Sequence, residues 1–142
     1  MDPYPAPVAT QAPSGYPAPL EPAAPLSVAF PSLDGTLLAG TFYAPLYEGA
    51  PVVVLMHQFG NTRRQWDGLA LWLQTGIPPV GVDWLPPMPN NLSFAVLTFD
   101  FRGHGDSEGN SNSSEAFLLD AQSAVAFARV QTGVDTLRVI TI

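Results

Sequence analysis

The sequence of 142 residues contains no cysteine and no lysine. Without cysteine the described chain can form no disulfide bond, no thiolate zinc site and no cysteine nucleophile. Five arginines stand against 12 acidic residues, which gives a net charge of −7. Because nucleic-acid binding depends on basic side chains that neutralise phosphates, this balance argues against a nucleic-acid partner. It argues equally against a basic patch on a membrane surface.

Long apolar runs are also missing. No stretch approaches the roughly 20 residues that a transmembrane helix needs, so we expect no transmembrane segment. The start, Met1-Asp2-Pro3, lacks the basic and apolar regions of a signal peptide, and the compartment is left open. Charged residues make up only 12% and hydrophobic residues 46%, which is typical of a chain that builds a core.

Proline and alanine dominate residues 1–25, with Tyr4-Pro5-Ala6-Pro7 followed by Tyr16-Pro17-Ala18-Pro19. Proline fixes φ and removes backbone donors, so this segment cannot join a helix or sheet. We expect a disordered tail or linker over 1–25 and a folded domain over 26–142. A peptide ligand for an aromatic groove is the alternative role, and a tether for an exported protein is a further one.

Strand patterns come next. Leu26–Phe30 and Leu37–Tyr43 flank Asp34-Gly35, which predicts a hairpin. The runs Val52–Met56, Phe94–Phe99 and Leu137–Ile142 are continuously apolar or nearly so, as in parallel strands that are covered on both faces.

Two helices are predicted between these strands. The first should begin near Thr62, where Thr62 and Gln65 have the spacing of a capping box, and end at Gly76. Its apolar face is Trp66, Leu69, Ala70 and Leu73. The second should begin near Glu115, capped by Asn112 or Ser114, and end at Gly133. Its predicted buried face is Phe117, Leu118, Ala121, Ala124, Val125 and Ala128.

Residues 77–91 are rich in proline, and we expect an ordered loop. Trp84 within it is interpreted as a cover for the edge of the core, with a substrate pocket as the alternative. The whole order is hairpin, strand, helix, strand, helix, strand. It predicts an α/β fold with a mostly parallel, doubly wound sheet, in which ligands bind beyond the carboxyl ends of the strands.

Two loops at those carboxyl ends resemble loops of the α/β-hydrolases. His57-Gln58-Phe59-Gly60 follows one strand and resembles the family's His-Gly-x loop. Asp100-Phe101-Arg102-Gly103-His104-Gly105-Asp106-Ser107 follows the next and resembles the family's Asp-x-Arg-Gly-x-Gly-x-Ser loop. The resemblance runs from about residue 27 to the end. The esterases, lipases and serine aminopeptidases are the most similar groups.

The resemblance implies roles for these residues. In the family, a backbone N–H of the first loop forms half of the oxyanion hole. By position Phe59 would supply it, with Gln58 as the other candidate. Gln58 departs from the family's usual glycine, which affects the geometry of the donors. The remaining loop residues are expected to be structural: His57, Gly60, Asp100, Arg102, Gly103, His104, Gly105 and Ser107.

One match to the nucleophile motif G-x-S-x-G is rejected. It covers Gly105–Gly109 with Ser107 at its centre. A nucleophile elbow joins a strand directly to a helix, and here the strand ends earlier and a polar segment follows. The family also places its histidine after the serine, and the sequence has no histidine after His104.

The family's nucleophile would follow the strand at Leu137–Ile142, and its acid and histidine would come later still. The sequence is therefore interpreted as the N-terminal portion of a serine hydrolase for an ester or amide substrate, truncated before its nucleophile elbow and inactive alone. A non-catalytic binding protein or an inactive fragment is the alternative. No cofactor and no metal are predicted, and the oligomeric state is left open.

Overall fold

A computed structural model describes residues 19–142. Its elements are β1 (Leu26–Pro31), β2 (Leu37–Tyr43), β3 (Ala50–Met56), the 3-10 turn η1 (Arg63–Trp66), α1 (Asp67–Thr75), β4 (Ala95–Phe99), α2 (Ser114–Arg129) and β5 (Val134–Thr141). The predicted order of strands and helices is confirmed, and β2 has the bounds that the hydrophobic pattern indicated.

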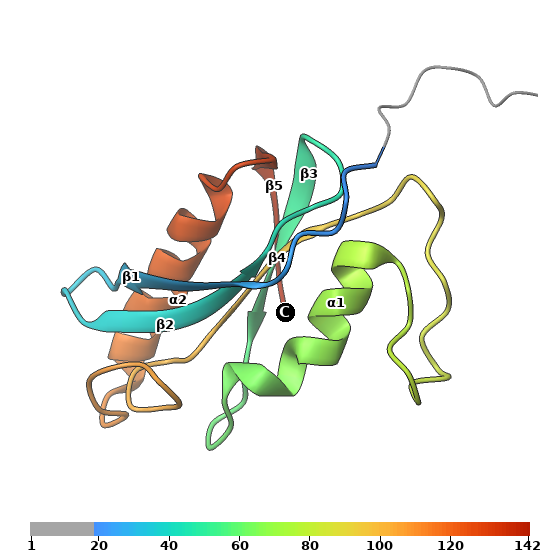
Figure 1. The fold of residues 1–142 in the computed structure, drawn as a ribbon. Helices are drawn as coiled ribbons and strands as arrows, with labels where there is room; N and C mark the ends of the chain where they lie inside the picture. The colour runs from blue at the N-terminus through green and yellow to red at the C-terminus, as the bar shows by residue number, and fades with distance from the viewer. Residues whose placement is uncertain (1–18) are drawn as a thin grey trace, which may run out of the picture.

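The five strands form one sheet in the order β1-β2-β4-β3-β5. β1 and β2 form the predicted antiparallel hairpin, and β2 also pairs antiparallel with β4. β4, β3 and β5 are parallel neighbours. The mostly parallel α/β sheet expected from the sequence is therefore present, with its hairpin at one edge (Figure 1).

The two helices cover opposite faces of this sheet (Figure 1). Alternate residues of β3 separate the two cores. Val52 and Val54 pack with Ala124 and Ala128 of α2, whereas Val53 and Leu55 belong to the core beneath α1. Because successive side chains of a strand point to opposite faces, a strand covered on both sides must be apolar throughout. That requirement explains the unbroken apolar run of β3.

The start of the first helix differs from the prediction. Thr62 makes no side-chain capping bond, and the chain first forms the 3-10 turn η1 before α1 begins at Asp67. The N–H of Arg63 instead donates to the carboxylate of Asp100, 2.7 Å away. A distant side chain thus replaces the predicted capping box. The predicted end at Gly76 is confirmed, since Gly76 has φ 73°.

The second helix is capped by Ser113, one residue from either predicted cap; its hydroxyl accepts from the N–H of Ala116. The helix ends at Arg129, so the prediction of Gly133 as its end was wrong. Gly133 lies at the entry to β5 instead, where its carbonyl accepts from the N–H of Ala50. Leu118 was wrongly assigned to the buried face, because 60% of it is exposed.

Residues 77–91 contain no helix or strand, as expected. The interpretation of Trp84 as a cover for the core was wrong: 76% of Trp84 is exposed, and the neighbouring Leu85 is the buried residue. None of the pockets described for this part of the chain includes Trp84.

The predicted tail over 1–25 lies outside the described residues up to position 18. Residues 19–25 have no helix or strand, but they lie against the domain. The N–H of Leu20 donates to Leu46, and the buried amide of Gln74 donates to the carbonyls of Ala23 and Ala44.

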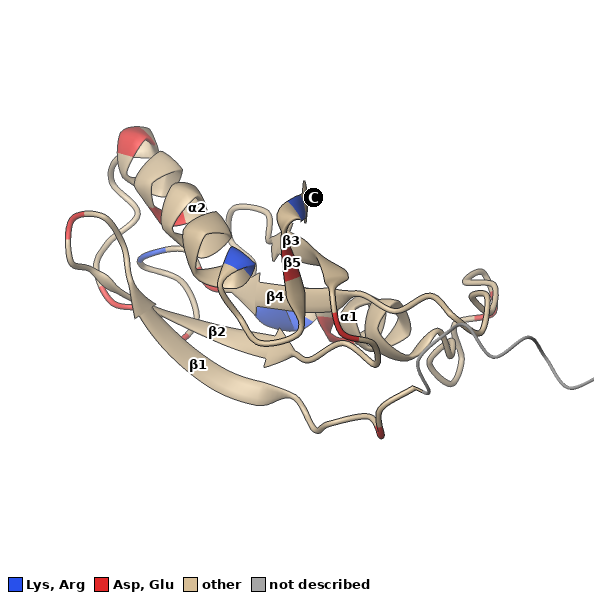
Figure 2. Cartoon of the chain, turned by 90° about the horizontal axis from the view of Figure 1, so that it is seen from above, with Lys and Arg blue, Asp and Glu red and all other residues tan. Residues whose placement is uncertain are grey.

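Acidic residues are distributed over separate loops, both helices and β5 (Figure 2). Among residues 19–142, no three histidine or carboxylate side chains are arranged to hold a metal ion. No helix in the same range has the length and apolar character that crossing a membrane requires.

Candidate active-site rim

The two loops singled out in the sequence lie side by side at one rim of the sheet. β3 and β4 are parallel neighbours, with Met56 opposite Phe99, so the loops that follow them leave at the same edge (Figure 1, lower part). A direct hydrogen bond joins them, because the N–H of Phe101 donates to Nε2 of His57 at 3.0 Å. The N–H of Gly60 also faces Nε2 of His104, at 3.4 Å.

His57 is buried and uses both ring nitrogens. Since Nε2 accepts from Phe101, the proton is on Nδ1, which faces the carbonyl oxygen of Gln58 at 2.9 Å. Burial lowers the pKa of His57, and His104 adds to that effect, while the hydrogen bond with Gln58 and the charge of Asp100 oppose it. The neutral ring is thus the form that this site favours.

Asp100 ends β4 and is fully buried. Its carboxylate accepts from the N–H of Arg63, the guanidinium of Arg63 and the N–H of Asp106. The guanidinium also reaches the carboxylate of Asp106 at 2.8 Å and the hydroxyl of Thr41 at 3.3 Å. Asp100 and Arg63 therefore bind the segment after β3 to the loop after β4.

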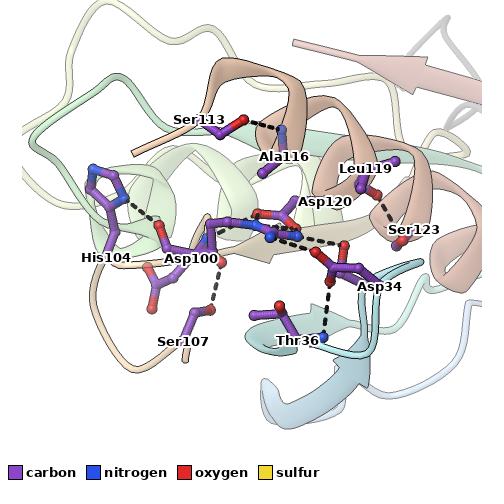
Figure 3. A network of polar contacts seen from close by, with 12 residues as sticks. Asp34, Thr36, Asp100, His104, Ser107, Ser113, Ala116, Leu119, Asp120 and Ser123 are labelled. Atoms are coloured by element: carbon purple, nitrogen blue, oxygen red, sulfur yellow. Dashed lines mark hydrogen bonds and ion pairs between the residues drawn. The ribbon is translucent and has the colours of Figure 1, made fainter. Parts of the chain in front are cut away.

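Arg102 is held by two carboxylates from distant segments. It forms hydrogen bonds to both carboxylate oxygens of Asp120 in α2, and it donates to Asp34 in the hairpin turn at 2.6 Å and to Ser32. Figure 3 shows Asp34 and Asp120 pointing into the same space. Arg102 holds the pKa of the Asp34 carboxyl well below its usual range, with help from the N–H of Thr36.

Ser107 is held by the backbone. Its hydroxyl donates to the carbonyl of Asp100 at 2.6 Å and accepts from the N–H of Ala39 at 2.8 Å. No hydrogen bond within residues 19–142 links it to a histidine ring. This hydroxyl is occupied in bracing the loop against β2, and Figure 3 shows it directed at Asp100.

Glycine at position 105 is required by a close approach. Gly105 has φ 48°, and a Cβ at this position would collide with the carboxylate of Asp100. At Gly103, which has φ 71°, a Cβ would lie 2.7 Å from the backbone nitrogen of Ser111. The two glycines let the loop fold tightly over the buried carboxylate.

Phe59 differs from its neighbours because it projects from the rim, with 79% of the residue exposed. Within residues 19–142, neither Phe59 nor Gln58 uses its backbone N–H in a hydrogen bond. Nearby, the end of β5 lies beside the end of β3: the N–H of Met56 donates to Ile142, and the N–H of Ile142 donates to Val54.

Sequence reasoning missed Arg63 and Asp120 as site residues, and it placed Phe117 on the buried face of the helix but not at the rim. Asp120 had a readable signal, because it occupies the same helical face as Phe117 and Ala124, at spacings of three and four residues. A single carboxylate on an otherwise apolar face indicates a buried ion pair. Arg63 had no such signal, since its partner is Asp100, in the loop beyond the next strand.

Comparison with known proteins finds relatives that match most of this chain. No family model matches the chain. The chain is 35% identical over 117 residues to YfhR of Salmonella typhi, an uncharacterized protein, and the match covers 80% of this chain and 35% of YfhR. It is 32% identical over 123 residues to the quorum-quenching protein AidA of Acinetobacter baumannii, covering 84% of this chain and 35% of AidA. The chain thus spans about a third of the length of these relatives.

Solved structures with the same fold include hydrolases. The α/β hydrolase GrgF from Penicillium sp. sh18 superposes with a TM-score of 0.67 at 19% identity, over 84% of this chain and 37% of GrgF. An esterase of Pyrococcus furiosus gives 0.61 at 17% identity, over 89% of this chain and 47% of the esterase. DcsB, solved with a substrate analogue, gives 0.64 at 20% identity, over 83% and 36%.

At these low sequence identities, the superpositions establish the fold alone. The chain has the fold of the α/β hydrolase GrgF and of the Pyrococcus furiosus esterase. Its own two glycine-bearing loops lie at the carboxyl ends of β3 and β4.

Proposed function

We propose that the protein is a serine hydrolase that cleaves an ester or amide bond, and that the loop after β3 supplies half of its oxyanion hole. The observation that carries this proposal is the N–H of Phe59, which has no acceptor within residues 19–142 and lies at the rim. Acyl transfer places negative charge on the carbonyl oxygen, and a donor held in advance stabilises it.

The surroundings of the loop support the same role. The histidine before it is locked by Phe101, and the residues after it are held by Asp100 through Arg63. A donor on such a braced loop needs little reorganisation during the reaction, which is the property that makes an oxyanion hole effective. The second donor and the triad are proposed to come from residues beyond β5, whose end lies beside Met56.

The alternative is a non-catalytic binding protein, which would have no nucleophile beyond β5 either. The hydroxyl of Ser107 bonds to two backbone partners, so the one serine at the centre of a G-x-S-x-G match is not available as a nucleophile. Under this alternative the rim would bind an acyl compound without cleaving it.

The nucleophile is tested by labelling. The natural gene product, isolated through an epitope tag, is treated with a serine-directed fluorophosphonate, beside the purified 142-residue chain. We expect label on the natural product at a serine outside these residues and none on the 142-residue chain. Absence of label on the natural product would remove the serine hydrolase proposal, and label on Ser107 would contradict the role assigned to that residue.

The oxyanion donor is tested by removing one N–H. Proline lacks the backbone donor, so Phe59→Pro should lower kcat for ethyl acetate about 100- to 1,000-fold with little change in KM. Gln58→Pro is the matched control one residue away. A large loss with Gln58→Pro alone would move the donor to Gln58.

A further inference from the structure

A small pocket opens at the rim between the two loops and the first turn of α2. It has a volume of about 170 Å³, and five side chains line it: His57, Phe59, Phe101, His104 and Phe117. All five are aromatic rings, and no charged carboxylate, ammonium or guanidinium group is among them. The pocket adjoins Phe59, whose backbone N–H is the proposed oxyanion donor.

Four of these rings form a closed cycle. His57 contacts Phe101 and His104 with centroid distances of 5.3 and 5.0 Å, and Phe117 closes the cycle against Phe101 at 5.4 Å and His104 at 6.0 Å. Phe59 joins at His104, 5.4 Å away. The contacts are edge-to-face or tilted, which is the geometry that aromatic pairs prefer.

The cycle is anchored from below and from the side. Phe101 packs on the buried Phe99 at 4.8 Å, which ties the pocket to the core. Both histidine rings are also fixed by their hydrogen bonds: His57 by Phe101 and Gln58, and His104 by the carbonyl of Arg102 and the N–H of Gly60. The pocket is therefore preformed, and filling it requires little ordering of side chains.

The chemistry of the walls defines the occupant. The ring nitrogens of both histidines already have backbone partners, so they offer little to a polar ligand. An anionic group would lose its hydration and meet only aromatic rings and nitrogens that already have backbone partners, which is strongly unfavourable. The size is equally restrictive, because an apolar cavity of about 150 Å³ holds one benzene molecule.

We propose that this pocket binds one uncharged, benzene-sized group of the substrate and so selects compact aromatic or branched apolar esters and amides. The binding itself follows from the walls alone, whereas the role in selecting a substrate rests on the function proposed above. Phe59 then serves twice, with its backbone N–H as the oxyanion donor and its ring as the outer wall of the pocket.

Binding is tested on the 142-residue chain with three probes: benzyl alcohol, its anionic analogue benzoate, and the two-ring 2-naphthylmethanol. Amide shifts in ¹⁵N-labelled protein report the site. We expect benzyl alcohol to shift Gly60, His104 and Phe117, and both other probes to bind about tenfold more weakly or not at all. Equal or tighter binding of benzoate, or shifts confined to other parts of the chain, would overturn the proposal.

Three variants make the test specific. Phe59→Ala removes an exposed wall and should weaken benzyl alcohol binding about 3- to 10-fold. Trp84→Ala, which removes an equally exposed aromatic ring outside the pocket, should leave binding unchanged. If Phe59→Ala fails to fold, Phe117→Leu tests the wall of the pocket that α2 contributes. Unchanged binding in a folded pocket variant would contradict the proposal.

Catalysis by the natural gene product separates this inference from the proposed function. Ethyl phenylacetate should be hydrolysed with a higher kcat/KM than ethyl acetate, and Phe59→Ala should remove most of the difference. Specific binding of benzyl alcohol with no hydrolysis of either ester would leave the pocket standing and remove the proposed function. Hydrolysis of both esters at the same rate, with no binding of benzyl alcohol, would overturn the proposal for the pocket and leave the proposed function in place.

Discussion

Two arginines hold the rim together, and Arg102, the buried one, gives the sharper test. Its partner Asp120 is fully buried in α2, so removing the guanidinium leaves an uncompensated charge in the interior. Breaking a buried pair in this way costs about 3–5 kcal/mol. We expect Arg102→Met to lower the free energy of unfolding of the 142-residue chain by that amount, measured by urea denaturation.

The matched control is Arg138→Met. Arg138 pairs with Asp135 three residues earlier in β5, and 57% of its side chain is exposed. Exposed pairs contribute about 0–1 kcal/mol. A loss for Arg138→Met as large as that for Arg102→Met would contradict the assignment of Arg102 as a buried anchor.

His57 should make the stability depend on pH. Burial lowers its pKa in the folded chain below the ordinary value of about 6.5. The unfolded chain therefore binds a proton first as the pH falls, and stability rises with pH wherever the unfolded state holds more protons. The stability from His57 is fully present above about pH 6.5 and is lost as the pH falls through the interval between the two pKa values.

The measurement is the free energy of unfolding between pH 7.5 and 5. Wild-type protein should lose stability over this range, and His57→Gln, which has no titrating ring, should show a flatter profile. His104→Gln retains the buried ring of His57, so the loss of stability should persist with a smaller slope, because His104 helps to lower the pKa of His57. Identical slopes for wild type and His57→Gln would show that His57 does not carry the effect.

At the scale of elements, the loop between β4 and α2 is limited by how closely its backbone approaches Asp100. Gly105→Ala places a methyl group against that carboxylate, whereas Gly35→Ala, in the hairpin turn, meets no atom within 4 Å. Both glycines have positive φ, so both variants share the cost of left-handed backbone.

We expect Gly105→Ala to destabilise the chain by at least about 2 kcal/mol more than Gly35→Ala, because it adds overpacking to the shared backbone cost. Thermal and urea unfolding of the two variants measure the difference directly. Equal destabilisation would mean that the loop can move away from Asp100 without cost.

The strands and the hairpin were predictable because their signals are local. Side chains of Leu37–Tyr43 alternate in burial beside the Asp34-Gly35 turn, and Val52–Met56 is apolar throughout. In both segments the neighbouring residues alone decide the conformation. The position of the two loops at one rim followed from the same information, since parallel strands place their carboxyl ends together.

The features that were missed depend on distant partners. The capping box at Thr62 competes with Asp100, and the buried carboxylate prevails because it accepts from both the N–H and the guanidinium of Arg63. The exposure of Trp84 has a similar origin, because Leu85 fills the position next to the core instead. The aromatic pocket was also beyond the sequence, since Phe117 reaches it only through the packing of α2.

At the scale of the whole molecule, the two edges of the sheet differ. β1 has Pro31 at its end and pairs with β2 along its full length. β5 pairs only with β3 within residues 19–142, and it carries Leu137, of which 90% is exposed, together with the exposed Ile140. An exposed apolar edge strand is a template for pairing with another chain.

We therefore expect the 142-residue chain to self-associate as its concentration rises, through β5 rather than through β1. Ile140→Lys places a charge on this edge and should shift the chain toward monomer in sedimentation velocity, because edge lysines block strand pairing. Leu118→Lys makes the same change on the exposed face of α2 and should leave association unchanged, since no backbone donors or acceptors are free there to pair. Association that persists in Ile140→Lys but disappears in Leu118→Lys would show that the contact lies on α2 and not on β5.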